Sequence, residues 1–178
     1  MNTFEHAEHD AITEVINSGF FTMGKKVAQF EEAIAEWVGA KHAIMVNSGS
    51  SANLLLVESM LRRSDPALAQ LKPGDEVLVP ALTWGTSVWP IVQLGLVPVF
   101  VDVNKSDLML NIEACKDAIS PKTKAMFLVH VFGKAANMDL VTDFCNTHGL
   151  LLIEDCCESL GAFHNNKHVG RFGKAGSL

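Results

Sequence analysis

The feature that most constrains the fold is a regular alternation of short, continuously apolar runs with segments of helical periodicity. Strands are expected in four such runs, at residues 76–79, 97–101, 125–129 and 150–153, and in a further short run at residues 43–46. Strands that are apolar at every position are typical of a parallel sheet with both faces covered. The chain is therefore predicted to be an α/β protein made of βαβ units, with a mainly parallel sheet flanked by helices.

The segments between these runs are predicted to be helices or turns. Helices are expected over residues 51–61, 85–94 and 139–148, and Asn111 is expected to cap a helix that runs to Ile119. Residues 62–70 are predicted to form a surface loop, and residues 161–170 a short hairpin that turns at Asn165 and Asn166.

Length and charge exclude several classes of protein. A chain of 178 residues, 48% hydrophobic and 19% charged, suits one globular domain. Its net charge is -6 and it has no basic stripe, which argues against a nucleic-acid partner. Polar residues and a proline interrupt the most apolar stretch, residues 91–103, so no membrane span is expected. Four cysteines without a disulfide spacing and an acidic N-terminus unlike a signal peptide indicate the cytoplasm.

A glycine- and serine-rich segment joins the run at residues 43–46 to the next predicted helix. It includes Gly49, Ser50 and Ser51 within the sequence NSGSSANLL of residues 47–55. Glycine lets a ligand approach the backbone, and a helix N-terminus favours an anion. The segment is thus a candidate phosphate site, with an ordinary helix cap as the alternative.

Two further segments follow the ends of predicted strands, where α/β sheets bind ligands. Trp84 comes after the run at residues 76–79, and its ring is suited to stacking on a flat ligand or to packing in a core or interface. Glu154 and Asp155 end the run at residues 150–153. A buried carboxylate there needs a partner, such as a protonated ring nitrogen, although helix capping and metal binding are also common for such a residue.

A metal site is the weaker alternative. Cys156, Cys157, His164 and His168 lie close together in the sequence, but their spacing matches no standard zinc motif. His130 ends an apolar strand and is expected to be a hydrogen-bonded structural residue rather than a base.

In this order, these segments resemble the DegT/StrS family of sugar aminotransferases, which are fold type I enzymes that use pyridoxal 5'-phosphate (PLP). The resemblance spans almost the whole chain and includes these further matches: FTMG at 21–24, PGDEV at 73–77, PVFVD at 98–102, PKTKA at 121–125 and IEDCCESLG at 153–161. The sequences NSGSSANLL, PALTW and EDCC especially resemble a subgroup, the nucleotide-sugar 3-dehydratases, which use pyridoxamine 5'-phosphate (PMP).

The resemblance assigns roles to six residues. Gly49, Ser50 and Ser51 are implied to bind the cofactor phosphate, Trp84 to stack on its ring, and Asp155 to pair with the ring nitrogen. Glu158 is implied to face the 3-hydroxyl of the ring, where many members carry Gln or His. An ionised carboxylate there accepts hydrogen bonds but donates none.

The resemblance also implies that residues 1–24 form an N-terminal arm and helix, and residues 25–178 a partial large domain without its C-terminal part and small domain. The Schiff-base lysine of aminotransferases, or the histidine of dehydratases, is expected past Leu178. Lys134 does not match its motif, and Lys174 stands where the family usually has Asp. The chain by itself is accordingly expected to be inactive.

The implied reaction of the whole protein is transfer of an amino group from glutamate to a keto-sugar nucleotide, in a homodimer, for lipopolysaccharide or another surface polysaccharide. The alternatives are 3-dehydration of a 4-keto-6-deoxy sugar nucleotide and a non-catalytic, cofactor-binding remnant.

Overall fold

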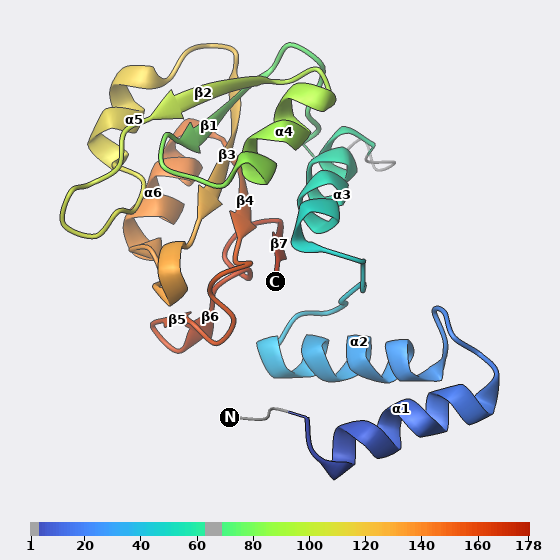
Figure 1. Ribbon diagram of the computed structural model, residues 1–178. Helices are drawn as coiled ribbons and strands as arrows, with labels where there is room; N and C mark the ends of the chain where they lie inside the picture. Colours follow the sequence, from blue (N-terminus) through green and yellow to red (C-terminus); the bar gives the residue numbers. More distant parts are fainter. Residues whose placement is uncertain (1–3, 63–68) are drawn as a thin grey trace. The chain divides into compact units, whose positions relative to one another are not determined.

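The computed structural model describes residues 4–62 and 69–178 of the chain (Figure 1). The chain divides into two compact units, one that ends at Met45 and one that begins at Val46. Every candidate site residue belongs to the second unit.

The first unit consists of α1 (His6–Ser18) and α2 (Lys25–Val38). Both helices end at a glycine with positive φ, 68° at Gly19 and 75° at Gly39, because glycine enters the left-handed conformation without a steric penalty. Nζ of Lys26 lies 2.7 Å from Oε2 of Glu14, which joins the two helices on the surface of the unit.

The strand expected at residues 43–46 is not formed, and this prediction was wrong. Met45 N–H donates to Oε1 of Glu31 at 2.7 Å, and Ile44 is 79% exposed. An apolar run becomes a strand only where a neighbouring strand completes its hydrogen bonds. None of the strands in the described residues pairs with this run.

The second unit is built on a parallel five-stranded sheet with the order β2-β1-β3-β4-β7. Its strands are β1 (Glu76–Pro80), β2 (Val97–Val101), β3 (Thr123–Val129), β4 (Leu151–Asp155) and β7 (Ala175–Ser177). The predicted parallel sheet is thus confirmed. β2 has the predicted bounds, those of β1, β3 and β4 differ from the prediction by one or two residues, and β7 was not predicted. β4 is buried along its whole length, which explains the apolar residues at 151–153.

Two pairs of helices cover the two faces of this sheet (Figure 1). The first pair is α3 (Gly49–Leu61) and α4 (Gly85–Gln93), and the second pair is α5 (Ile112–Ala118) and α6 (Met138–His148). The chain runs from β1 outward to β2 and then returns to β3 on the other side of β1. Right-handed crossovers therefore place α4 and α6 on opposite faces. Such a reversal of direction marks the carboxyl ends of the strands as the ligand-binding edge.

The local predictions for helices and turns are confirmed in most places. Oδ1 of Asn111 accepts hydrogen bonds from the N–H groups of Glu113 and Ala114, so Asn111 caps α5 as expected. β5 (Phe163–His164) and β6 (Lys167–His168) form the predicted hairpin, and its turn residues Asn165 and Asn166 have φ of 49° and 60°. Most of the loop predicted at residues 62–70 lies outside the described residues.

No helix in the described residues has both the length and the apolar composition needed to cross a membrane.

Candidate functional site

Glu154 and Asp155 form the end of β4, and both carboxyl groups are buried. Glu154 is 0% exposed and Asp155 is 5% exposed. Because successive side chains of a strand point to opposite faces, the two carboxylates enter different surroundings. The partners of Asp155 and those of Glu154 are therefore different residues.

The carboxylate of Asp155 is surrounded by hydrogen-bond donors from three other parts of the second unit. Oδ2 accepts from Nδ2 of Asn53 on α3 and from Oγ of Ser87 on α4, both at 2.8 Å. Oδ1 accepts from the N–H of Cys157 at 3.1 Å and lies 3.4 Å from Oγ of Ser177 on β7. A buried carboxylate therefore finds partners here, and those supplied by the protein are neutral.

The glycine- and serine-rich segment forms the start of α3. Oγ of Ser48 accepts a hydrogen bond from the N–H of Ser51 at 3.2 Å, so the helix-cap interpretation holds for Ser48. The first N–H groups of a helix have no partner inside it, which leaves those of Gly49 and Ser50 directed out of the helix end. A Cβ atom on Gly49 would lie 2.5 Å from Sγ of Cys157. The two predicted segments are thus in direct contact, and an anion site at this helix end fits the residues present.

Trp84 stands at the N-cap of α4 and is 74% exposed, so it is not a core residue. Its carbonyl oxygen accepts a hydrogen bond from the N–H of Ser87 at 3.0 Å. Because Ser87 Oγ in turn donates to Asp155, Ser87 links the backbone of Trp84 to the buried carboxylate. The structure thus brings the segments of Gly49, Trp84 and Asp155 together.

Glu158 is exposed and belongs to a different contact. Its Oε2 accepts a hydrogen bond from the N–H of Phe132 at 3.0 Å. Phe132 lies in the turn after β3 and has a φ of 54°, which is uncommon for a residue with a side chain. Glu158 is not among the groups that contact the carboxylate of Asp155.

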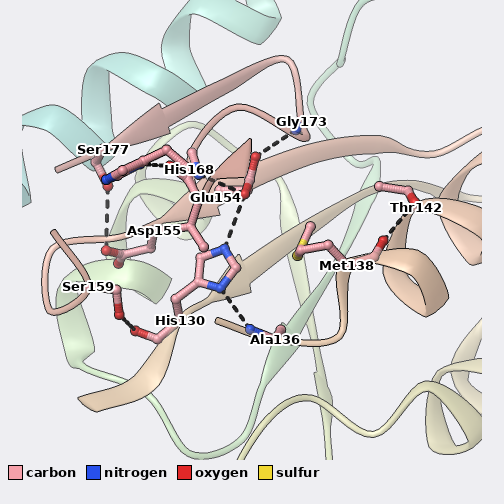
Figure 2. A network of polar contacts seen from close by, with 12 residues as sticks. His130, Ala136, Met138, Thr142, Glu154, Asp155, Ser159, His168, Gly173 and Ser177 are labelled. Atoms are coloured by element: carbon pink, nitrogen blue, oxygen red, sulfur yellow. Dashed lines mark hydrogen bonds and ion pairs between the residues drawn. The ribbon is translucent and has the colours of Figure 1, made fainter. Parts of the chain in front are cut away.

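Glu154 is the centre of a second polar cluster (Figure 2). Its Oε2 lies 3.1 Å from Nε2 of His130, and the N–H groups of Gly170 and Gly173 donate to its two oxygens at 2.8 and 2.6 Å. Nδ1 of His130 accepts from the N–H of Ala136 at 3.1 Å, so the ring proton is on Nε2 and points to Glu154. His130 is therefore a neutral, hydrogen-bonded structural residue, as expected.

The only group of three or more potential metal ligands within residues 4–62 and 69–178 is His130, Glu154 and Cys156. A metal on Nε2 of His130 would displace the proton that the Ala136 hydrogen bond fixes there. Burial, helped by the charges of Glu154 and Asp155, raises the pKa of the Cys156 thiol far above its ordinary value. The side chains of His130 and Glu154 are thus already engaged in hydrogen bonds within the protein, and we interpret this cluster as structural.

The cysteines and histidines of the proposed metal alternative have separate partners. Nε2 of His168 accepts from the N–H of Gly161, and His164 lies 3.0 Å from Asp139. Cys157 contacts the start of α3 instead.

The sequence did not identify three residues of the Asp155 cluster: Asn53, Ser87 and Ser177. Asn53 is 1% exposed, Ser87 is 0% exposed and Ser177 is 3% exposed. For Ser87 the sequence did contain a signal, because it is a polar residue at an inward position of a mostly apolar helix. Only the fold shows that its side chain contacts Asp155.

Together these features define a class of protein. A parallel sheet with an aspartate at the end of an interior strand, a glycine-led N-terminus of α3 and an exposed tryptophan at the start of α4 form the cofactor-binding part of a fold type I PLP enzyme. The chain belongs to the DegT/DnrJ/EryC1/StrS aminotransferase family, whose pattern it matches over residues 2–178.

Curated relatives in this family act on nucleotide sugars. The chain is 40% identical over 177 residues to GDP-4-keto-6-deoxy-D-mannose 3-dehydratase of Escherichia coli O55:H7, with 99% of this chain and 45% of the relative covered. It is 38% identical over 167 residues to GDP-perosamine synthase of Vibrio cholerae, with 93% and 43% covered. The chain thus spans less than half the length of these relatives.

A solved structure of the E. coli 3-dehydratase with bound hydrated PLP has a TM-score of 0.90 to this chain at 40% identity. The match covers 97% of this chain and 44% of that structure. It supports the assignment of the fold type, and it contains the cofactor that the sequence predicts.

Proposed function

We propose that this chain is the cofactor-binding part of an enzyme that uses PLP or PMP to act on a nucleotide-linked keto sugar. The observation that carries the proposal is the convergence of three segments, those of Gly49, Trp84 and Asp155, on one buried polar cluster. Each segment supplies a different kind of contact, and together these match a ligand with a phosphate, a flat ring and a basic ring nitrogen.

Each candidate site residue has a defined role in this proposal. The N–H groups at the start of α3, with Ser50 and Ser51, bind the phosphate, and the exposed indole of Trp84 stacks on the ring. Asp155 keeps a proton on the ring nitrogen through a charged hydrogen bond. With that proton in place, the bound cofactor withdraws electrons from the substrate carbon attached to its nitrogen. Glu158 lies outside the Asp155 cluster, so its contact with the 3-hydroxyl remains a separate proposal.

We place 3-dehydration of a GDP-linked 4-keto-6-deoxy sugar first. The 3-dehydratase relative matches 177 residues at 40% identity, and the sequences NSGSSANLL and EDCC resemble that subgroup. Amino transfer from glutamate is the second candidate, and it is favoured by the match to GDP-perosamine synthase over 167 residues. Both products suit the synthesis of surface polysaccharide. A homodimer and a cytoplasmic location are part of the proposal, the latter supported by four free thiols.

Cofactor binding is tested on the chain itself by titrating PMP and following quenching of tryptophan fluorescence. PMP is preferred to PLP because it forms no Schiff base with surface lysines. We expect saturable quenching that is greatly reduced in Trp84→Phe, while binding by calorimetry is lost in Asp155→Ala. Absence of binding to the wild-type chain would contradict the proposed site.

The reaction is tested on the full encoded protein with GDP-4-keto-6-deoxymannose, glutamate and cofactor, with mass spectrometry of the product. Dehydration gives a 4-keto sugar that has lost one oxygen atom, whereas amino transfer gives a sugar with an amine in place of the keto oxygen. A lysine at the Schiff-base position of the encoded protein favours amino transfer, and a histidine favours dehydration. Bound cofactor without any product would support the non-catalytic alternative.

A further inference from the structure

The two carboxylate oxygens of Asp155 accept different numbers of hydrogen bonds. The number depends on which acceptor takes the single hydroxyl proton of Ser177. A serine hydroxyl has one proton to donate. Oγ of Ser177 lies 2.7 Å from Oδ1 of Asn53 but 3.4 Å from Oδ1 of Asp155. The proton of Ser177 therefore goes to Asn53, and its contact with Asp155 is not a hydrogen bond of ordinary length.

The side-chain amide of Asn53 has a fixed orientation as a result. Its oxygen accepts from Ser177, so its nitrogen faces Asp155 and donates to Oδ2 at 2.8 Å. Sγ of Cys157 lies 3.5 Å from Oγ of Ser177 and supplies a weak donor at the start of this series. The hydrogen bonds thus run in one direction, from Cys157 through Ser177 and Asn53 to Asp155.

Oδ2 of Asp155 is consequently filled, because Asn53 and Ser87 each donate to it at 2.8 Å. Oδ1 receives one proper donor, the N–H of Cys157 at 3.1 Å. A carboxylate oxygen accepts two hydrogen bonds, so Oδ1 retains a free lone pair.

We infer that Asn53 and Ser87 are positioning residues that hold Oδ2 of Asp155 and so reserve Oδ1 for the protonated ring nitrogen of the cofactor. Both are buried on helices whose first turns carry the other predicted contacts, Gly49 on α3 and Trp84 beside α4. The same two helices thus set the phosphate contact, the ring contact and the carboxylate orientation. This inference rests on the proposed function, and neither residue is assigned a contact with the cofactor.

The first test compares PMP with its analogue in which the ring nitrogen is replaced by a CH group. Ser87→Ala removes one of the two donors that hold Oδ2 of Asp155, so Oδ1 is no longer fixed toward the ring nitrogen. PMP should then bind about tenfold more weakly, as expected when its one charged hydrogen bond to Asp155 is weakened. The analogue has no ring nitrogen, so its affinity should be the same in wild type and Ser87→Ala. Ser87→Thr keeps the hydroxyl and should restore most of the PMP affinity. Equal weakening of both ligands, or of neither, would overturn the inference.

A second pair of variants tests the proton count. In Asn53→Ala the hydroxyl of Ser177 loses its acceptor, and Oδ1 of Asp155 is the next one available. PMP should then bind about tenfold more weakly, because the lone pair reserved for the ring nitrogen is occupied. Adding Ser177→Ala to Asn53→Ala should recover part of this loss. No recovery would overturn the inference, and circular dichroism of each variant shows whether the fold is retained.

The two proposals fail in different ways. If the wild-type chain binds neither PMP nor the analogue, the proposed function fails and this inference fails with it. If wild type binds PMP but the Ser87 and Asn53 variants bind it equally well, only the inference fails.

Discussion

Nε2 of His130, at the end of β3, lies 3.1 Å from Oε2 of Glu154 on β4, and neither side chain has any exposed surface. The same carboxylate accepts the N–H groups of Gly170 and Gly173, which precede β7. Glu154 therefore ties the edge strand that carries Ser177 to the centre of the sheet. Its neighbour Asp155 faces the opposite side and holds the candidate cofactor site, so one strand end combines a structural carboxylate with a functional one.

Replacing Glu154 by Gln should destabilise the second unit by about 2–4 kcal/mol. Three donors point at the two carboxylate oxygens, and an amide of the same shape offers one oxygen and places its NH₂ group against another donor. Urea denaturation followed by circular dichroism measures the change. Glu113→Gln is the matched control, because its side chain is 79% exposed and should lose less than about 0.5 kcal/mol. Equal midpoints for the two variants would show that the Glu154 cluster contributes no stability.

Alkylation by iodoacetamide should report on the site through Cys157. Cys157 is exposed as a residue, but desolvation of its sulfur by the surrounding protein, with a smaller effect from the charge of Asp155, raises the pKa of this thiol to about 11. Because the thiolate is the reactive form, the rate should rise about tenfold per pH unit from pH 7 until it levels off near that pKa. Cys115, Cys145 and Cys156 are buried and should stay unmodified while the chain is folded.

Mass spectrometry of the alkylated peptides measures these rates, with Cys157→Ser as the control that should lose the modification. PMP should slow the reaction, because Cys157 touches both Gly49 and the Asp155 cluster. A rate that levels off near pH 8.5, the ordinary thiol value, would mean that the surroundings of the sulfur do not raise its pKa.

Patterns within a segment predicted most of the fold, whereas contacts between segments were not predictable. The apolar run of β4 and the cap at Asn111 act locally, so periodicity and residue type identified them. The run at residues 43–46 has the same apolar character, but a strand also requires a neighbour, which no local pattern reveals.

The same distinction applies to the site. Gly49, Trp84 and Asp155 follow strands or begin helices, and these positions point to ligand binding in any α/β sheet. Ser87 and Ser177 contact Asp155 across 68 and 22 residues of sequence. Their roles follow from the order in which α4 and β7 are placed around β4, so they became visible only in the folded chain.

Gly49→Ala should destabilise the second unit by about 1–3 kcal/mol, because the new methyl group would lie 2.5 Å from Sγ of Cys157. Cys157→Ala removes that sulfur, and the remaining Cβ of residue 157 is 3.5 Å from the added methyl, an ordinary contact. The double variant should therefore recover most of the loss. Unfolding midpoints of the two single variants and the double variant complete the cycle. Additive effects of the two substitutions would mean that the glycine is not required by this contact.

Gly173→Ala should be more damaging, because its methyl group would overlap the carbonyl oxygen of Leu152, a backbone atom on β4. That carbonyl accepts the N–H of Lys174 at 2.8 Å, which is the bond that brings the chain into register for β7. The backbone carbonyl of Leu152 cannot rotate out of the way without breaking this hydrogen bond. We therefore expect the free energy of unfolding to fall by about 3 kcal/mol and hydrogen exchange in β7 to become faster. Gly85→Ala is the matched control, since its methyl group would meet only the movable indole of Trp89 at 3.2 Å. If Gly173→Ala retains both the stability and the slow exchange of β7, the close approach of this loop to β4 is not needed to hold Ser177 beside Asn53.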